Sequence, residues 1–341
     1  MSSSLVLPQS KDAQGTRSND TTRTDGSPAQ LPRLTTTVPA EYVHRAALAE
    51  VFLTDCEKTG ESTFVLTGQW PRAHTFFSTP DGRHHDHLQA CETLRQTGIY
   101  LAHAEFGIPL GHHFVMQDMT VTTRPEHLAI GTAPTRLTLN TTLTRTRRSP
   151  NFTISLTITN EHGDTLSTGY GHFTCISPAA YQRLRAANPT NPHPTDPTAH
   201  TLDALRHIPT HQDPTTYGRV HPRDLVLAPT HQPHLYRLNP DPAHPILFDH
   251  DGDHIPGMVL IEAARQATHP HPDPANTHLT HTHTEFHHYV ELITPCHVTS
   301  TAPVTTPTAT GYTTTHTITS HQNNHPTHTT TLTHTTTHPP A

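Results

Sequence analysis

The chain has 341 residues, enough for two domains of ordinary size, but only 32% of them are hydrophobic, against about half in typical globular proteins. With 33 Pro and 35 His, much of the chain should be loop, and the rest can bury two cores of about 100 residues each. The net charge is −7 with His neutral, and only 14% of residues are charged. A nucleic-acid partner is therefore disfavoured, because phosphate binding needs clustered Lys and Arg.

Cysteine usage and hydropathy point to the cytoplasm. No C-x-x-C pair or zinc spacing occurs among the four Cys, which are Cys56, Cys91, Cys175 and Cys296. Isolated Cys in a chain without a signal peptide are most often reduced. The stretch 1–33 lacks the apolar segment of a signal peptide, and no apolar run approaches the roughly 18 residues of a membrane span. We expect a cytoplasmic protein with no membrane partner.

Order should begin after a polar segment, 1–35, that lacks periodicity and is expected to be disordered. A first domain is predicted over 36–183. It starts with short strands at Glu50–Thr54 and Ser62–Thr67, and a loop at Trp70–His74 because of its Pro. A helix is predicted from Leu88 to His103, where apolar residues recur at helical spacing.

Period-two patterns follow this helix. They predict strands at Phe114–Val121, Thr135–Asn140, Phe152–Ile158 and Asp164–Ile176, the last entered through a hairpin turn at Asn160–Gly163. One helix followed by a run of antiparallel strands is typical of the α+β class.

A Pro-rich linker is predicted over 184–217, because Asn-Pro and Asp-Pro sequences block regular structure. The pattern then restarts in a second domain, 218–322. Here Arg219–Leu227 echoes the region that begins at Tyr42, and the expected elements are a helix at Met258–Ala267 and strands at Phe286–Ile293 and Tyr312–Thr319. The Thr/His-rich end, 323–341, is expected to be a tail.

One signature occurs twice in the chain. Asp-Gly-x-His, seven residues and Glu-x-x-Arg-Gln occupy Asp81–Gln96 and again Asp251–Gln266, and they align without a gap. An internal repeat of this size indicates two copies of one domain. The copies differ where the helix begins, since only the second has a Pro-Gly step, at Pro256 and Gly257.

The second copy resembles the central helix of hotdog-fold enzymes, in whose acyl-carrier-protein dehydratases a Pro-Gly-x-Leu-x-x-Glu-Ala-x-x-Gln run opens the buried helix. Residues from roughly 36 to 320 are more specifically similar to the A-factor synthase (AfsA) family. The features that carry this likeness are Val43-His44-Arg45, Glu50–Thr54, Trp70-Pro71-Arg72-x-His74, Glu92-x-x-Arg95-Gln96 and His254-x-Pro-Gly-Met-x-x-x-Glu262-Ala-x-Arg-Gln266.

This resemblance implies an α+β, tandem (double) hotdog fold, in which each unit wraps an antiparallel β-sheet around a long central helix. It also implies an acyltransferase. The β-ketoacyl group of an acyl carrier protein thioester would pass to a hydroxyl of dihydroxyacetone phosphate, on the way to a γ-butyrolactone-type signalling molecule that regulates secondary metabolism and antibiotic production. No cofactor is expected.

The resemblance further implies a composite catalytic pair, Glu92 from the first helix and Arg265 from the second. Glu92 would be the general base, with a pKa raised by burial, and Arg265 would anchor the phosphate or stabilise the oxyanion. Glu262, Arg95 and His254 are further catalytic candidates. The alternative is that each Glu and the Arg three residues later form an intrahelical ion pair worth a few tenths of a kcal/mol.

Substrate-binding candidates come from three places. The opening at Pro256, Gly257 and Met258 would present helix amides to a thioester carbonyl, or would be a helix-starting proline with no further role. The loop of Trp70, Arg72 and His74 suits a phosphate or a pantetheine arm, or the Trp fills an open edge of the domain. The repeat adds His84, Gln96 and Gln266.

The many His residues, as in His281–His288, could bind a metal, but drift toward C- and A-rich codons is the commoner explanation, and no metal is expected. Two other functions stay open: a hotdog dehydratase or thioesterase, and a non-catalytic acyl-thioester or lactone-binding module. For a dehydratase, neither His250 nor His254 has the expected spacing from the helical carboxylate. A monomer is the default expectation, and a homodimer through open sheet edges is the alternative.

Overall fold

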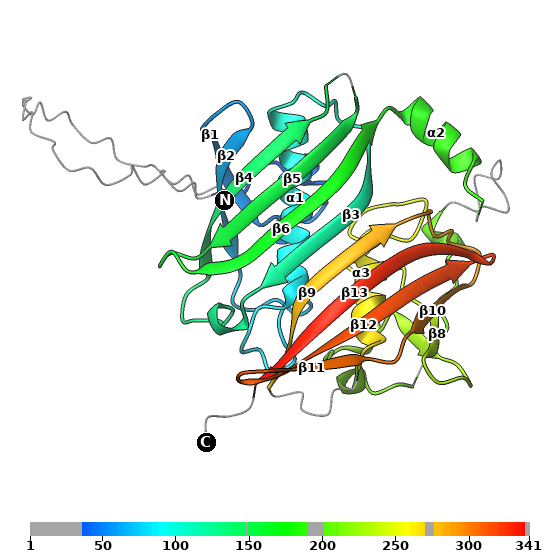
Figure 1. Ribbon diagram of the computed structural model, residues 1–341. Coiled ribbons are helices and arrows are strands. Elements are labelled where there is room, and N and C mark those ends of the chain that lie inside the picture. The colour runs from blue at the N-terminus through cyan, green and yellow to red at the C-terminus, as the bar shows by residue number, and fades with distance from the viewer. Residues whose placement is uncertain (1–35, 148, 190–200, 210, 270–275, 338–341) are drawn as a thin grey trace, which may run out of the picture. The chain divides into compact units, whose positions relative to one another are not determined.

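One antiparallel sheet runs through both copies of the repeat (Figure 1). The computed structural model describes residues 36–147, 149–189, 201–209, 211–269 and 276–337. The segment 1–35, expected to be disordered, lies outside these ranges. Within them, 13 strands form the sheet in the order β1-β2-β4-β5-β6-β3-β9-β13-β12-β10-β8-β7, and β11 pairs with β12.

The first copy supplies one long helix and six strands. These are β1 (Leu53–Lys58), β2 (Thr63–Trp70), α1 (His87–Ala104), β3 (His113–Thr123), β4 (Thr135–Arg145), β5 (Asn151–Thr159) and β6 (Thr165–Ile176). Short 3-10 turns lie at Ala40–Val43 (η1), Leu48–Glu50 (η2) and Pro125–His127 (η3).

The second copy repeats this plan. Its elements are β7 (Leu227–Pro229), β8 (Leu235–Leu238), α3 (Gly257–Gln266), β9 (Thr277–Phe286), β10 (Cys296–Ser300), β11 (Val304–Thr308), β12 (Gly311–Gln322) and β13 (His325–Thr337). Between the copies, the described residues form the helix Pro178–Ala186 (α2) and 3-10 turns at Leu202–Ala204 (η5), Pro214–Tyr217 (η6) and Pro222–Asp224 (η7). None of the helices in the described ranges is both long and apolar enough to cross a membrane.

The two halves meet at β3 and β9. These strands pair antiparallel from Asp118–Glu285 to Thr122–His281, so the sheet continues from one copy into the other. Figure 1 shows α1 behind the first half of the sheet and α3 behind the second. Because both helices lie on the same face of one sheet, their side chains can bury against each other as well as against the strands.

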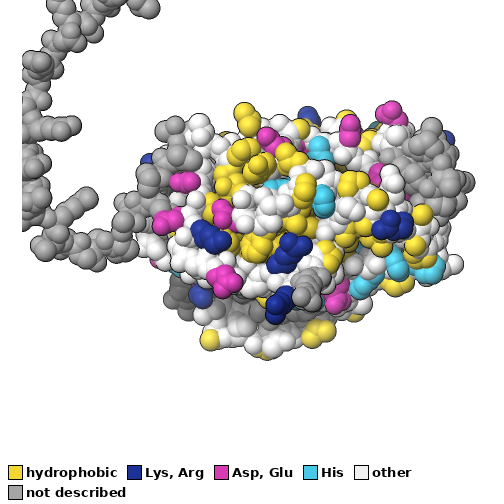
Figure 2. All heavy atoms as spheres, turned by 90° about the horizontal axis from the view of Figure 1, so that it is seen from above, with side chains coloured by type: hydrophobic (Ala, Val, Ile, Leu, Met, Phe, Trp, Pro, Cys, Tyr) yellow, Lys and Arg dark blue, Asp and Glu magenta, His cyan; other side chains and the backbone are white. Residues whose placement is uncertain are grey.

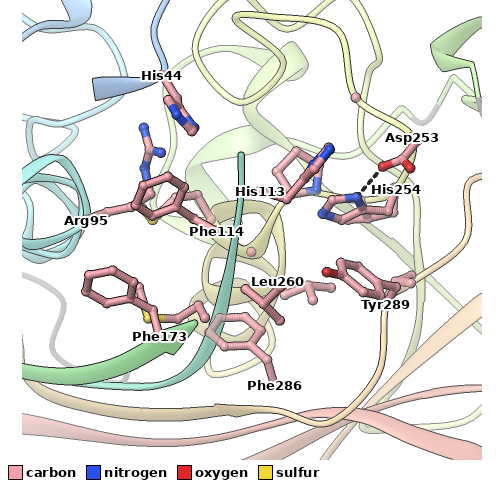
Figure 3. A pocket seen from close by; sticks show the side chains of 18 of the residues that line it. His44, Arg95, His113, Phe114, Phe173, Asp253, His254, Leu260, Phe286 and Tyr289 are labelled. Carbon is pink, nitrogen blue, oxygen red and sulfur yellow. Dashed lines mark hydrogen bonds and ion pairs between the residues drawn. The ribbon is translucent and has the colours of Figure 1, made fainter. Parts of the chain in front are cut away.

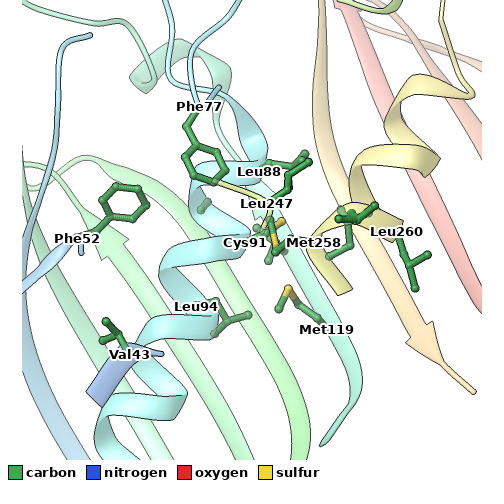
Figure 4. Close-up of a cluster of buried hydrophobic side chains, with 14 of the residues drawn as sticks. Val43, Phe52, Phe77, Leu88, Cys91, Leu94, Met119, Leu247, Met258 and Leu260 are labelled. Atoms are coloured by element: carbon green, nitrogen blue, oxygen red, sulfur yellow. The ribbon is translucent and has the colours of Figure 1, made fainter. Parts of the chain in front are cut away.

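The helices share one hydrophobic core instead of the two expected from composition. Figure 4 shows Leu88 and Cys91 of α1 directed toward Met258 of α3, with Leu247 and Met119 beside them. Asp86 caps α1, since its carboxylate accepts a hydrogen bond from the Leu88 amide at 2.8 Å. The helix that follows is buried on nearly every side, as expected of a helix wrapped by a sheet.

Most predicted elements are confirmed: both helices, the strands that became β2 to β6, and the strand that became β12. Three predictions were wrong. The chain makes the turn η2 at Leu48–Glu50, and its strand starts only at Leu53. The strand predicted at Phe286–Ile293 lies earlier in the chain, since β9 spans Thr277–Phe286 and ends where the predicted strand would begin. The linker was expected to begin at residue 184, but that residue still belongs to α2. Ser177 caps this helix by accepting a hydrogen bond from the Ala180 amide.

The predicted tail was also wrong, because residues 325–337 form β13, between β12 and β9. Apart from Leu332, the buried side chains of its inner face are Thr and His, where a core usually has Leu or Ile. His328 is fully buried, with Nε2 hydrogen bonded to the hydroxyls of Thr284 (2.8 Å) and Thr330 (2.6 Å). These partners satisfy polar groups that would otherwise cost free energy in a core.

Buried neutral His residues should make the fold sensitive to acid. Burial lowers the pKa of His328 and of His87 from 6.5 to about 3. Below pH 6.5 the unfolded chain binds protons at these rings, whereas the folded chain does not until about pH 3, so stability falls as pH falls through this window. We expect the melting temperature in calorimetry to decrease steadily from about pH 7 to about pH 4. A constant melting temperature over that range would contradict the buried, neutral state of these rings.

Candidate active site

Glu92 lies fully buried in the middle of α1, and three side chains donate hydrogen bonds to it. They are Arg45 (Nε to Oε1, 3.0 Å), Arg95 (Nε to Oε2, 2.9 Å) and Gln96 (Nε2 to Oε1, 2.8 Å). Burial alone would raise the pKa of this carboxyl, but the charges of Arg45 and Arg95 outweigh it and lower the pKa to about 2. The expectation of a raised pKa was therefore wrong.

Glu262 has the same surroundings in α3. Arg219 donates from Nε to Oε1 at 2.8 Å, Arg265 donates from Nε to Oε2 at 2.8 Å, and Gln266 donates to Oε1. The two guanidinium groups outweigh burial and hold the pKa of Glu262 well below its usual range. Each central helix thus carries a buried carboxylate held between two Arg residues.

The geometry corrects the alignment of the segments that precede the helices. Arg95 donates to the Val43 carbonyl at 3.2 Å, and Arg265 donates to the Tyr217 carbonyl at 3.0 Å. Val43 therefore corresponds to Tyr217 and Arg45 to Arg219. The sequence had suggested that the segment beginning at Arg219 matches the one beginning at Tyr42, which is an error of three residues. The next residues, His44 (φ 52°) and Gly218 (φ 65°), both adopt the left-handed conformation. The sequence hid this correspondence because the residue types differ.

The composite pair of Glu92 and Arg265 is not formed, because each is bound within its own copy. The two carboxylate clusters instead contact the other copy through Arg45 and Arg219, which lie in the segments before the helices. Arg45 donates from NH1 to the Ile246 carbonyl at 2.7 Å, and Arg219 donates from NH1 to the Phe76 carbonyl. Each cluster therefore donates a hydrogen bond to a backbone carbonyl of the other copy.

A cavity of about 1290 Å³ lies beside α1 and at the start of α3. Its apolar wall comes from α1 and the strands over it: Leu94, Gly98, Ile99, Phe114, Met119, Ile154 and Phe173. Its polar wall includes His44, Arg95, His113, His250, Asp253 and His254. Figure 3 shows His44 and Arg95 on one side, Asp253 and His254 on the other, and aromatic side chains below them.

Five of the residues expected at the site line this cavity: Arg95, His254, Pro256, Gly257 and Met258. Pro256 is the N-cap of α3, one position before the place expected for it, and makes no side-chain capping hydrogen bond. A Cβ at Gly257 would lie 3.2 Å from the Phe286 ring, so a larger residue here would require a small shift of that ring. The first amides of α3 precede the intrahelical hydrogen bonds and are available to a carbonyl oxygen.

The other expected substrate-binding residues do not line the cavity. Trp70 ends β2, fully buried, and its indole donates to Thr93 Oγ1 at 2.9 Å. Arg72 is exposed and donates to the Gly131 carbonyl at 2.8 Å. His74 accepts hydrogen bonds from the Phe76 and Phe77 amides. The side chains of this loop thus stabilise the fold of the first copy and do not line the cavity.

The three remaining candidates also lie elsewhere. Gln96 joins α1 to the segment before β1, through the Phe52 amide and the Glu50 carbonyl. Gln266 makes the matching contacts in the second copy. His84 packs its ring against that of His278, 5.3 Å away between centroids. Gln96 and Gln266 therefore tie each central helix to the segment before it, and His84 packs against β9 of the second copy.

The cavity wall carries charges of both signs, from Arg45 and Arg95 and from Asp203, Asp251 and Asp253. Burial and then Arg95 lower the pKa of His44 from 6.5 to about 3, and burial and Arg95 also lower that of His250. The face seen in Figure 2 has hydrophobic side chains with His side chains among them, and both Lys or Arg and Asp or Glu side chains lie around them. An anion bound beside Arg95 would meet an environment that favours negative charge.

No metal site is present among the described residues. The His residues of β9 are hydrogen bonded to Thr side chains of β3 at the seam. His281 Nδ1 lies 2.9 Å from Thr122 Oγ1, and His283 Nδ1 lies 2.8 Å from Thr120 Oγ1.

Two central helices against one continuous sheet, with a cavity at the start of the second helix, define a protein of two tandem hotdog units. The family model for the A-factor biosynthesis hotdog domain matches residues 26–177 and 200–338. The chain belongs to this family, as the sequence analysis expected.

Named relatives agree. The chain is 43% identical over 77% of its length to a 2-oxo-3-(phosphooxy)propyl 3-oxoalkanoate synthase of Streptomyces virginiae, covering 86% of that protein. It is 32% identical over 76% of its length to the synthase of the same name from Streptomyces griseus, covering 83% of it. A solved acyl-ACP thioesterase from Bacteroides thetaiotaomicron is similar over 80% of this chain and 98% of its own, with a TM-score of 0.48 and 10% identity.

Proposed function

We propose that the protein transfers a 3-oxoacyl (β-ketoacyl) group from an acyl carrier protein thioester to a hydroxyl of dihydroxyacetone phosphate. In this reaction a C–O bond forms, the C–S bond breaks, and the carrier thiol is released. The product is the phosphorylated ester that the names of the Streptomyces relatives describe. γ-Butyrolactone-type signals that regulate secondary metabolism would derive from such an ester.

One observation carries the proposal: one cavity joins an apolar slot to a wall that includes Arg95 and to the start of a helix. The slot, which runs past Leu94, Gly98 and Phe173, suits an acyl chain. The amides of Gly257 and Met258 suit the thioester carbonyl, whose oxygen becomes negative during attack. Arg95, which lines the cavity, suits the phosphate of the acceptor.

Glu92 then has a different role from the one expected. It does not line the cavity, and its pKa of about 2 makes it a weak base at neutral pH. Its contacts with Arg45 and Arg95 fix two cations at the cavity wall. We propose that Glu92 is a positioning residue for these cations, and that Glu262 and Arg265 form the corresponding structural cluster of the second copy.

The reaction is tested by incubating the protein with a β-ketoacyl carrier protein, with and without dihydroxyacetone phosphate, and determining the products by mass spectrometry. A phosphorylated ester that appears only with the triose supports the proposal. Free acid would indicate a thioesterase, and an enoyl thioester would indicate a dehydratase. Binding of the acyl donor without turnover would indicate a non-catalytic module, and each of these three results contradicts the proposal.

The depth of the slot should respond to Gly98, in the middle of α1. A Cβ at this position would lie 3.2 Å from Phe173 Cε1 and 3.5 Å from Ile154 Cδ1. We expect Gly98→Ala to fold, because Ala favours a helix, and to lower kcat/KM about tenfold for the longest acyl donor relative to the shortest. Steady-state kinetics with a series of chain lengths measures this ratio.

The matched control is Gly131→Ala, since a Cβ at Gly131 meets no atom within 4 Å and this residue lies outside the cavity wall. It should leave the chain-length ratio unchanged. If Gly98→Ala also leaves the ratio unchanged, the acyl chain does not lie beside Gly98.

A further inference from the structure

An Asp–His pair opens the helix of the second copy and is missing from the first. In the repeat, Asp253-His254 stands where the first copy has Arg83-His84. Asp253 Oδ1 and His254 Nδ1 lie 2.7 Å apart, and His254 lines the cavity with 31% of its side chain exposed. In the first copy Arg83 instead pairs with Asp81, with 72% of its side chain exposed. Only the second copy therefore presents a carboxylate-bound imidazole to the cavity.

The helix between the copies fixes the carboxylate of this pair. Tyr181 of α2 donates from its hydroxyl to Asp253 Oδ1 at 2.7 Å, and Arg185 donates to Asp253 Oδ2 at 3.3 Å. Arg185 is itself anchored by Glu291, at 2.6 Å and 2.7 Å. The ring of Tyr181 stacks on that of His113, 3.6 Å between centroids. Asp253 is thus held by both copies and by the segment that joins them.

The side chains around His254 are polar or aromatic. Asp253 and Tyr181 contact Nδ1, Tyr289 packs edge-on at 4.7 Å between centroids, and His113 and Arg185 lie just beyond. Hydrogen bonds from His254 and Tyr181, together with the charge of Arg185, outweigh burial and hold the pKa of Asp253 below its usual range. An ionised Asp253 favours the tautomer with the proton on Nδ1, which leaves a lone pair on Nε2.

The other His side chains of the cavity wall lack this arrangement. His44 is bonded to His103, 2.9 Å between their Nε2 atoms, and His113 is stacked on Tyr181. Among the described residues that line the cavity, His254 alone is a His hydrogen bonded to a carboxylate. It also stands three residues before Gly257, whose amide opens α3. The carboxylate-bound imidazole and the carbonyl-binding amides are therefore part of one short segment.

We propose that His254, oriented by Asp253, is the general base and acid of the acyl transfer, and that Tyr181 is a positioning residue for this pair. The hydroxyl of the acceptor gives its proton to Nε2 as its oxygen attacks the thioester carbonyl. The resulting oxyanion accepts hydrogen bonds from the first amides of α3. When the C–S bond breaks, the imidazolium returns the proton to the leaving thiolate. This assignment rests on the proposed function.

The test uses His254→Gln in the full chain, with a β-ketoacyl carrier protein and dihydroxyacetone phosphate. We expect kcat to fall about a hundred- to ten-thousand-fold, with little change in KM for the acyl donor. The acidic limb of the pH–rate profile should disappear with the base. In His254→Ala, added imidazole should restore part of the activity, which a merely structural role would not allow. Should His254→Gln fail to fold, Asp253→Asn takes its place and should lower kcat while the chain stays folded.

A matched control is available on the outer face of the sheet. His172 is hydrogen bonded to Asp118 and to Tyr170, each at 2.8 Å, so it has the same three residue types but does not line the cavity. His172→Gln should keep the wild-type rate and pH profile. A His254→Gln enzyme that retains its rate within about threefold would overturn the assignment. If the wild-type protein itself forms no ester, the proposed function fails and not this assignment alone.

Discussion

Replacing Glu92 by Gln should lower the free energy of unfolding by about 3–5 kcal/mol, because the buried Arg45 and the partly buried Arg95 lose the carboxylate that they share. Arg45 and Glu92 are 5% and 0% exposed in their side chains, so water cannot take over the lost interaction. The remaining folded enzyme should bind the phosphorylated acceptor more weakly, since Arg95 is no longer fixed. Urea denaturation followed by circular dichroism measures the stability, and KM for dihydroxyacetone phosphate measures the second effect.

Glu57→Gln is the control, because Glu57 is exposed on β1 and should change stability by less than about 0.5 kcal/mol. A Glu92→Gln protein as stable as wild type, with kcat reduced to background, would show that Glu92 is the base after all. It would then have to reach the substrate through a rearrangement of α1.

A chain truncated after residue 322 should not fold cooperatively. This change removes β13, which pairs with β12 over its whole length and with β9 at the seam between the copies. It also exposes the inner edges of two strands, and the loss should exceed the total stability of about 5–15 kcal/mol of a typical domain. Thermal unfolding followed by circular dichroism should show no cooperative transition.

The control chain ends at Thr337, after the last residue of β13. It should unfold at the wild-type temperature. A cooperative transition in the chain ending at residue 322 would mean that the C-terminal strand is dispensable, as the sequence had suggested.

Both central helices were predictable because their signals are strong and local. The helix at Leu88–His103 has apolar residues at regular helical spacing, and the second follows a Pro-Gly step. The repeat of Glu-x-x-Arg-Gln then identified two copies of one domain. In the structure each Glu and Gln holds the segment before its own helix, which explains why the pattern occurs in both copies.

The C-terminal strand was missed for a physical reason. Apart from Leu332, the buried positions of β13 hold Thr or His in place of apolar residues, so the strand lacks the hydrophobic period of a half-buried strand. Thr is β-branched and favours strands, and that propensity was the signal available in the sequence. Burial of its polar side chains depends on partners such as Thr284, which lies far away in the chain.

The location of the cavity depends on contacts that no local pattern reveals. Glu92 and Arg265 were expected to meet because the family resemblance implies a composite pair, but each is satisfied within its own copy. The residues that do meet at the cavity wall come from different segments: Arg95 from α1, His254 before α3, and Tyr181 from a stretch adjacent to the expected linker. Asp253 in place of Arg83 is a difference that the sequence shows, and it falls in the copy to which we assign the general base.

The central claim is that one site, built from both copies, holds the acyl chain in the first copy and its carbonyl at the second helix. A crystal structure with a β-ketoacyl pantetheine amide, in which nitrogen replaces the thioester sulfur, tests it directly. We expect the carbonyl oxygen to lie within hydrogen-bonding distance of the Gly257 or Met258 amide, and the acyl chain to lie beside Leu94 and Gly98. An acyl chain bound instead beside His84, at the start of α1, would contradict it.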